Sequence, residues 1–280
     1  MSRLRLNIRE QMAMEDNGDP ANVFIRPGDG ETITNREGRE VIVLTAREAI
    51  TVTDYRIAPG EGGPDLHVHR EHTDAFYVLD GELDLTVGAE RERVRTGAGG
   101  LVAAPPNCIH TFANGSDREV RFLNLHTPDG GFAGFMRARR EGDETVTFDT
   151  HAPPPDGGLP LSEAIVAGPG EGERRLSGPR VALIKAAIPH MCFAEFEVDG
   201  SYEGPSRHSH EVEVDAFYVL EGELEFTVED SREVVGAGTL ASIPPGVAHA
   251  FDTVGSTPAR FLNIHAPDAG FAEFLRRASD

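Results

Sequence analysis

The amino-acid sequence contains one long pattern twice. "HVHREHTDAFYVLDG" begins at His67, and "HSHEVEVDAFYVLEG" begins at His208, 141 positions later. Downstream, "GGLVAAPPNCIHTFAN" (99–114) corresponds to "GTLASIPPGVAHAFDT" (238–253) at an offset of 139. Self-similarity of this kind is the signature of a repeated structural unit. We therefore expect one fold built twice, with an intervening turn two residues shorter (141 − 139) in the second copy.

Each copy is rich in short apolar and alternating segments bounded by Gly and Pro, which is typical of β-strands in a sandwich or barrel. Asp80-Gly81 and Glu221-Gly222 predict hairpin turns, because tight hairpins need residues that tolerate positive φ. The sequence thus predicts an all-β chain of two tandem barrels, each closed by a short C-terminal helix. Apolar residues at helical spacing, expected to pack on the barrels, follow the expected N-caps Asp129 and Asp268: Phe132, Phe135, Met136, Phe271, Phe274 and Leu275.

Four segments are expected along the chain. Residues 1–22 are polar and aperiodic, and we predict an N-terminal arm. Residues 23–140 are predicted to form the first domain and residues 164–280 the second. Residues 141–163 form the expected linker, and because its Pro run prefers an extended backbone, it should act as a strap rather than a flexible tether.

Composition restricts the class of protein. The net charge of −21 argues against nucleic acid or an anionic membrane as a partner. No apolar run reaches the roughly 20 residues of a membrane-spanning helix, and the start has no apolar signal segment, so a cytoplasmic location is expected. Two cysteines do not make a disulfide framework. Cys108 is either a pocket thiol or, as we expect, a small buried residue in a turn.

Six histidines and two aspartates repeat in corresponding positions. Residues i and i+2 of an extended segment point to the same side, so the two histidines of each His-x-His pair should converge. Buried imidazoles without partners cost about 1–3 kcal/mol each, and a shared cation removes that cost. The alternative is a hydrogen-bonded polar core or a surface position. We predict one divalent transition metal (Fe, Mn, Ni, Co or Zn) in each barrel. The candidate ligands are His67, His69, Asp74, His110, His208, His210, Asp215 and His249.

These segments resemble the two motifs of the cupin superfamily, Gly-x5-His-x-His-x3–4-Glu-x6-Gly and Gly-x5-Pro-x-Gly-x2-His-x3-Asn. Residues 67–81 and 99–114 match them in the first copy, and 208–222 and 238–253 match them in the second, although the leading Gly of the first motif is out of register. Asn107 replaces a Gly, and because Asn tolerates positive φ, the turn should be kept. The resemblance implies a bicupin, with two antiparallel jelly-roll barrels (double-stranded β-helices).

The main departure from the motif is Asp at the Glu position in both copies. Asp is shorter by one methylene, about 1.3–1.5 Å of reach, whereas metal–ligand distances vary by only about 0.2 Å. One outcome, which we favour, is that the strand lies further inward and Asp74 and Asp215 bind the metal. The other is that three histidines hold the metal, and the Asp orients a histidine or serves as a base.

Such histidine-rich bicupins are similar to quercetinase- and diketone-type dioxygenases. This resemblance implies a small enolic or phenolic substrate, flavonol- or diketone-like, with Asp74 or Asp215 as the catalytic base that takes the enol proton. The alternatives are a metal-dependent isomerase or decarboxylase, as in the oxalate-decarboxylase-like bicupins, and a non-enzymatic protein that binds a metal or a small molecule. Pairing of chains in a homodimer stays open. The expected apolar pocket wall consists of Phe76, Phe112, Phe217 and Phe251.

Three further features of the pattern allow two interpretations each. His72 has no counterpart, and we expect a solvated loop histidine rather than a substitute ligand. His126 and His265 each stand two residues after an Asn, and either line the pocket or support the cap of the helix that follows. Arg121 and Arg260 are expected to lie at a strand edge, where they favour solubility, rather than to act as an anion clamp.

Overall fold

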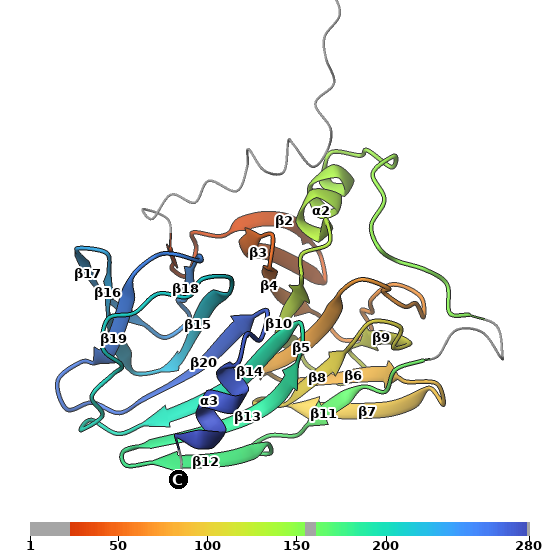
Figure 1. Ribbon diagram of the computed structural model, residues 1–280. Coiled ribbons are helices and arrows are strands. Elements are labelled where there is room, and N and C mark those ends of the chain that lie inside the picture. The colour runs from red at the N-terminus through yellow and green to blue at the C-terminus, as the bar shows by residue number, and fades with distance from the viewer. Residues whose placement is uncertain (1–22, 155–160, 279–280) are drawn as a thin grey trace, which may run out of the picture.

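The computed structural model describes residues 23–154 and 161–278. Within these ranges it contains two seven-stranded sheets, two three-stranded sheets and two short helices, α2 (Phe132–Arg140) and α3 (Phe271–Arg277). Figure 1 shows the small sheets at opposite ends of the molecule, with the large sheets between them. The all-β prediction is therefore confirmed. The arm predicted for residues 1–22 lies outside the described residues, as do residues 155–160 of the expected linker and residues 279–280.

The two halves use the same strand order. In the first half, the large sheet has the order β11-β8-β5-β10-β4-β3-β2 and the small sheet the order β7-β6-β9. The bounds of these strands are β2 (Glu31–Arg36), β3 (Arg39–Arg47), β4 (Ile50–Ile57), β5 (Thr73–Asp80), β6 (Glu82–Val87), β7 (Glu92–Gly97), β8 (Leu101–Ala104), β9 (His110–Ala113), β10 (Val120–Thr127) and β11 (Ile165–Ala167).

In the second half, the corresponding orders are β1-β18-β15-β20-β14-β13-β12 and β17-β16-β19. The bounds are β1 (Phe24–Ile25), β12 (Glu173–Ser177), β13 (Arg180–Ile188), β14 (Met191–Val198), β15 (Val214–Glu221), β16 (Glu223–Val228), β17 (Ser231–Gly236), β18 (Leu240–Ile243), β19 (His249–Thr253) and β20 (Ala259–Ala266).

Each large sheet contains an edge strand from the other half of the sequence. β11 pairs antiparallel with β8, with Val166 opposite Val102. β1 pairs antiparallel with β18, with Phe24 opposite Ala241. The backbone hydrogen bonds of these edges therefore join the two halves, in addition to the packing of their side chains.

The central strands are buried on both faces. In β5, Phe76 and Val78 point into the core of the first barrel, whereas Ala75 and Tyr77 belong to an apolar cluster that includes residues of both halves. Tyr77 stacks on Phe193 of the second half with ring centroids 5.5 Å apart. Because side chains alternate along a strand, one face of each large sheet lines its barrel and the other packs against the neighbouring half.

Arg121 and Arg260 do not lie at a strand edge, so that expectation is wrong. β10 is placed between β5 and β4 in its sheet, and β20 is placed between β15 and β14. Arg121 Nη2 donates to Asp54 Oδ2 at 2.6 Å and to the hydroxyl of Tyr218, in the other half, at 3.2 Å. These arginines therefore neutralise carboxylates beside the interface between the halves.

The hairpin prediction is also wrong. β5 pairs with β8 and β10, and β6 pairs with β7 and β9, so the chain passes at Gly81 from the large sheet to the small one. Gly81 has a φ of 80°, and a Cβ there would lie 2.7 Å from the carbonyl oxygen of Glu119. Gly81 is thus needed at a corner between two sheets, because the backbone at Glu119 passes too close for a side chain.

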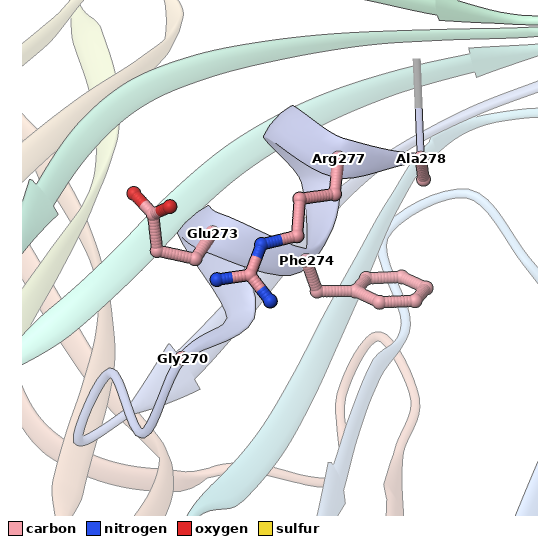
Figure 2. A pocket seen from close by; sticks show the side chains of 5 residues that line it. All are labelled: Gly270, Glu273, Phe274, Arg277 and Ala278. Carbon is pink, nitrogen blue, oxygen red and sulfur yellow. The ribbon is translucent and has the colours of Figure 1, made fainter. Parts of the chain in front are cut away.

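The N-caps of the two helices are Gly131 and Gly270, so the prediction of Asp129 and Asp268 as caps is wrong, although both Asp side chains bond to the first turn of their helix. Asp129 Oδ1 accepts a hydrogen bond from the amide of Ala133 at 3.1 Å, and Asp268 accepts the corresponding bond in the second half. One apolar position also differs from the expectation. In α3, Leu275 is buried, but Phe274 is 58% exposed and lines a surface pocket beside the helix (Figure 2). The expectation that Phe274 packs on the barrel is therefore wrong.

The structure also bears on the cysteines and on the expectation that no helix spans a membrane. Cys108 and Cys192 are free and buried, and burial raises the pKa of the Cys108 thiol to about 11, which suits a small core residue rather than a reactive thiol. Among the described residues, no helix has the length and apolar character needed to cross a membrane.

Candidate metal centres

The eight candidate ligands come together as two groups of four. Within each group, one ring nitrogen or carboxylate oxygen of every residue lies within 4.8 Å of those of the others. We call these the first group (His67, His69, Asp74 and His110) and the second group (His208, His210, Asp215 and His249).

Backbone pairing aligns the members of each group. The His67 amide donates to the His110 carbonyl at 3.2 Å, and the His110 amide returns the bond at 2.9 Å. His208 and His249 make the same pair at 2.9 and 2.7 Å. The His-x-His segments form isolated bridges rather than full strands, but the alternation of side chains still directs both imidazoles of a pair into one group.

Backbone carbonyls fix the tautomers of the histidines in the first group. The three Nδ1 atoms lie 2.5–3.0 Å from carbonyl oxygens: His67 from Asp65, His69 from Asp149, and His110 from Cys108. A carbonyl oxygen only accepts, so each Nδ1 carries a proton and donates it. In a neutral ring, Nε2 is then left with a bare lone pair.

These lone pairs face a carboxylate. His110 Nε2 lies 3.2 Å and His69 Nε2 3.8 Å from Asp74 Oδ2. In the second group, His249 Nδ1 donates to a carbonyl at 3.0 Å, and its Nε2 lies 3.1 Å from Asp215 Oδ2. Two acceptors at this separation repel unless a cation lies between them. Imidazole nitrogens with one carboxylate oxygen suit Fe, Mn, Co, Ni or Zn, so the residues present fit a divalent transition metal.

The Asp side chains reach into their groups despite being shorter than Glu. Ligands bound at about 2.1 Å to one ion lie about 3.0 Å apart when adjacent and about 4.2 Å apart when opposite. The distances of 3.1–3.8 Å from Asp74 and Asp215 to their histidines fall in this range. Asn124 and Asn263 each donate to Oδ1 of the Asp, which leaves Oδ2 directed at the imidazoles. This geometry favours direct ligation over the three-histidine alternative.

Charge within the groups matches a divalent ion. Burial, with smaller contributions from His110 and His69, lowers the pKa of His67 to about 4, so the ring is neutral at pH 7. Burial alone would raise the pKa of Asp74, but the facing histidines, His126 first, hold the pKa of this carboxyl well below its usual range. With the His67 ring neutral and the Asp74 carboxyl ionised, the first group carries a buried negative charge that a cation neutralises.

The two groups differ in exposure because residues 148–151 of the expected linker, which we call the covering segment, lie over the first group only. His151 pairs with Val68 through backbone bonds of 2.9 and 3.0 Å. Asp149 Oδ2 accepts from the amides of residues 70 and 71 at 2.9 and 2.8 Å. The Phe148 ring lies 5.3 Å from the His69 ring, centroid to centroid. All members of the first group are buried, whereas His208 and His210 are half-buried. Within the described residues, the second group is therefore the more accessible.

Several expectations about neighbouring residues need correction. His72 is fully buried, with its ring centroid 4.0 Å from that of His69, so it is not a solvated loop histidine. His126 and His265 each stack at 3.7 Å on the first Phe of the following helix and also face the Asp of their group, so each contacts both the helix and a candidate metal centre. Asn107 adopts a φ of 64°, which confirms that the turn before His110 is kept.

The four phenylalanines expected to form a pocket wall lie in the barrel cores. Phe76 and Phe112 pack with ring centroids 5.4 Å apart, and Phe217 and Phe251 with centroids 5.0 Å apart. All four are at most 9% exposed. They fill the barrels next to the histidine groups and hold these groups in place by packing.

Fold and site together define a protein of two β-barrels with one candidate metal centre in each. The model of the cupin domain family matches residues 53–126, which contain the four ligands of the first group, and residues 194–265, which contain the four ligands of the second group. The chain belongs to the cupin family and, with two such domains, is a bicupin.

Known proteins extend this comparison. Quercetin 2,3-dioxygenase of Bacillus subtilis (strain 168) is 25% identical over 303 residues, covering 92% of this chain and 86% of that protein. Protein Ylba of E. coli superposes with a TM-score of 0.62 at 14% identity, over 88% of this chain and 91% of the other. Oxalate decarboxylase of Lactobacillus farciminis gives a TM-score of 0.61 at 16% identity, over 88% and 86%. At these identities, the solved structures show a shared fold.

Proposed function

We propose that this bicupin is a metal-dependent dioxygenase that acts on a small enolic or phenolic substrate of the flavonol or 1,3-diketone type. The observation that carries the proposal is the convergence of three imidazoles and one carboxylate in each half. The similarity to quercetin 2,3-dioxygenase over 92% of this chain supports the substrate class. The likeness to oxalate decarboxylase concerns the fold, so no observation favours decarboxylation over oxygenation.

In this proposal the chain's own residues have distinct roles. The three histidines and the Asp of each group hold the metal, which when bound supplies Lewis acidity toward a substrate oxygen. Asp215 takes the enol proton, and the Asn263 side chain keeps one carboxylate oxygen of Asp215 in a fixed direction during the transfer. Phe217 and Phe251 exclude water from the inner side of the second group.

We place the reaction in the second half. A substrate must reach the ion, and two histidines of the second group are half-buried while every member of the first group is buried. The backbone pair between Val68 and His151 holds the covering segment over the first group. The first half then serves chiefly to stabilise the fold and the interface.

Oxygen uptake tests both parts of the proposal. Protein reconstituted with iron, nickel or manganese is assayed with a panel of flavonols and 1,3-diketones. We expect uptake in the wild type and in His110→Ala, and loss of uptake in His249→Ala. Absence of uptake with every metal and substrate would refute the dioxygenase, and loss in His110→Ala with retention in His249→Ala would place the reaction in the first half. Carbon dioxide release from oxalate without net oxygen use would instead indicate a decarboxylase.

A further inference from the structure

A third cluster of histidines lies beside the first group. One ring nitrogen from each of His69, His72 and His126 lies within 4.8 Å of those of the other two. The residues are 2%, 0% and 2% exposed, respectively. His72 and His126 are outside the first group, so the metal centre described above does not account for them.

The tautomers of these histidines follow from their partners. His72 Nδ1 lies 3.1 Å from Asp149 Oδ2, an oxygen that already accepts two backbone amides, so Nδ1 donates and Nε2 keeps a lone pair. His126 Nε2 lies 3.2 Å from Asn124 Oδ1. The Asn124 amide group donates to Asp74 and to a backbone carbonyl, which identifies Oδ1 as the acceptor, so His126 donates through Nε2 and keeps a lone pair on Nδ1.

The resulting lone pairs have no protein partner. His69 Nε2, His72 Nε2 and His126 Nδ1 are buried nitrogens without a hydrogen bond among the described residues. Each such atom costs about 1–3 kcal/mol if it stays unsatisfied. One water molecule has two protons and satisfies at most two of the three acceptors. A divalent cation satisfies all three, and the rings of Phe148 and Phe132 beside them keep the cluster apolar on its outer side.

The counterpart group in the second half, His210, Glu213 and His265, has a carboxylate in the place of the third imidazole. Glu213 Oε1 lies 3.2 Å from His210 Nδ1 and 3.3 Å from His265 Nδ1. His265 Nε2 lies 3.3 Å from Asp215 Oδ1. Both nitrogens of His265 therefore face carboxylates, so a set of three unpartnered imidazole nitrogens occurs in the first half and not in this group.

We propose that His69, His72 and His126 form a second metal position in the first half. His69 belongs to both sets and its Nε2 binds one ion at a time, so the two positions are alternatives for a single ion. The ligand is a divalent transition metal that accepts a three-imidazole set, such as Co(II) or Zn(II). The inference concerns binding alone and does not depend on the proposed reaction.

Cobalt binding tests the second position directly. In a His208→Ala/His210→Ala background, which removes two ligands from the second half, the metal-free chain is titrated with Co(II), and visible absorption and elemental analysis report the bound ion. Adding His67→Ala/His110→Ala removes the first group except for His69 and Asp74. We expect about one Co(II) per chain to remain, since three imidazoles suffice for a tight site. Absence of bound Co(II) in this folded variant would overturn the proposal.

Further substitutions identify the ligands. Adding His72→Ala or His126→Ala to that variant should weaken Co(II) binding by at least about tenfold. His151→Ala is the matched control, because His151 is a half-buried histidine of the covering segment that belongs to neither set. Co(II) binding that persists unchanged after His72→Ala would overturn the assignment.

A milder variant covers the case in which the multiple substitution does not fold, as judged by circular dichroism. In the His208→Ala/His210→Ala background, His110→Ala alone removes one imidazole of the first group and leaves His69, His72 and His126 in place. We expect this variant to bind Co(II), and the same variant with His72→Ala added to bind it at least about tenfold more weakly. Equal binding by the two would contradict the second position. No substrate or oxygen enters these titrations, so their failure and the failure of the dioxygenase proposal are separate results.

Discussion

Asn263→Ala tests how the carboxylate of the second group is held. Asn263 Nδ2 donates to Asp215 Oδ1 at 2.5 Å and to the Ala216 carbonyl at 3.4 Å, and Asn263 and Asp215 are 4% and 2% exposed. A hydrogen bond to a buried charge contributes about 1.5–3 kcal/mol. About 1.36 kcal/mol corresponds to a factor of ten in an equilibrium constant. If the lost hydrogen-bond energy appears as weaker metal binding, the affinity for the metal falls about 10- to 100-fold.

The assay is a titration of metal-free protein with Zn(II) in competition with a chromophoric chelator. A His69→Ala/His110→Ala background confines tight binding to the second half. The matched variant is Asn124→Ala in a His72→Ala/His210→Ala/His249→Ala background, which removes a ligand of the second position and should show a loss of similar size in the first group. If Asn263→Ala keeps its affinity within about twofold while circular dichroism shows an intact fold, the reasoning that Asn263 fixes the carboxylate for the metal is refuted.

Three further predictions concern stability. The metal-free protein should lose stability as the pH falls from about 6.5 toward 4, because burial lowers the pKa of His67 to about 4 and that of His72 to about 3. In this pH range the unfolded chain takes up protons that the folded chain does not. Urea unfolding midpoints that do not change between pH 7.5 and 5 would contradict this prediction. Phe193→Ala should cost about 3–5 kcal/mol in urea unfolding, because the ring is fully buried between the halves; a cost below about 1 kcal/mol would exclude that role. Gly222→Ala should lower the melting temperature more than Gly246→Ala. Both glycines have positive φ, but only at Gly222 would an added Cβ meet a carbonyl oxygen, at 2.4 Å. Equal shifts in melting temperature for the two variants would argue against this close contact.

The duplication made much of the fold predictable. Two copies of one pattern require the same pairing twice, and the strand-rich class and the helix that ends each copy follow from spacing alone. Asp80-Gly81 does not by itself specify a hairpin, because a residue with positive φ fits a hairpin and a corner between two sheets equally well. The turn residues do not determine which strand pairs with which. The exchanged strands β1 and β11 are too short to show a periodic pattern.

The candidate ligands were predictable because they occur twice at fixed spacing. His72 and Asp149 were not, since neither has a counterpart at the repeat offset and they meet only through the folded chain. Burial of His72 depends on the ring of Phe148, which comes from the covering segment 76 positions later (148 − 72). A repeat identifies what the copies share, whereas the difference between the two centres comes from residues that occur once.

Each half is expected to hold one divalent metal in a histidine and aspartate site. The most direct measurement is the metal content of the reconstituted chain by elemental analysis. From the two groups we expect about two ions per wild-type chain, about one in His69→Ala/His110→Ala, about one in His210→Ala/His249→Ala, and none when these four substitutions are combined. A wild-type chain that binds no metal, or a combined variant that binds as much as the wild type, would contradict the account.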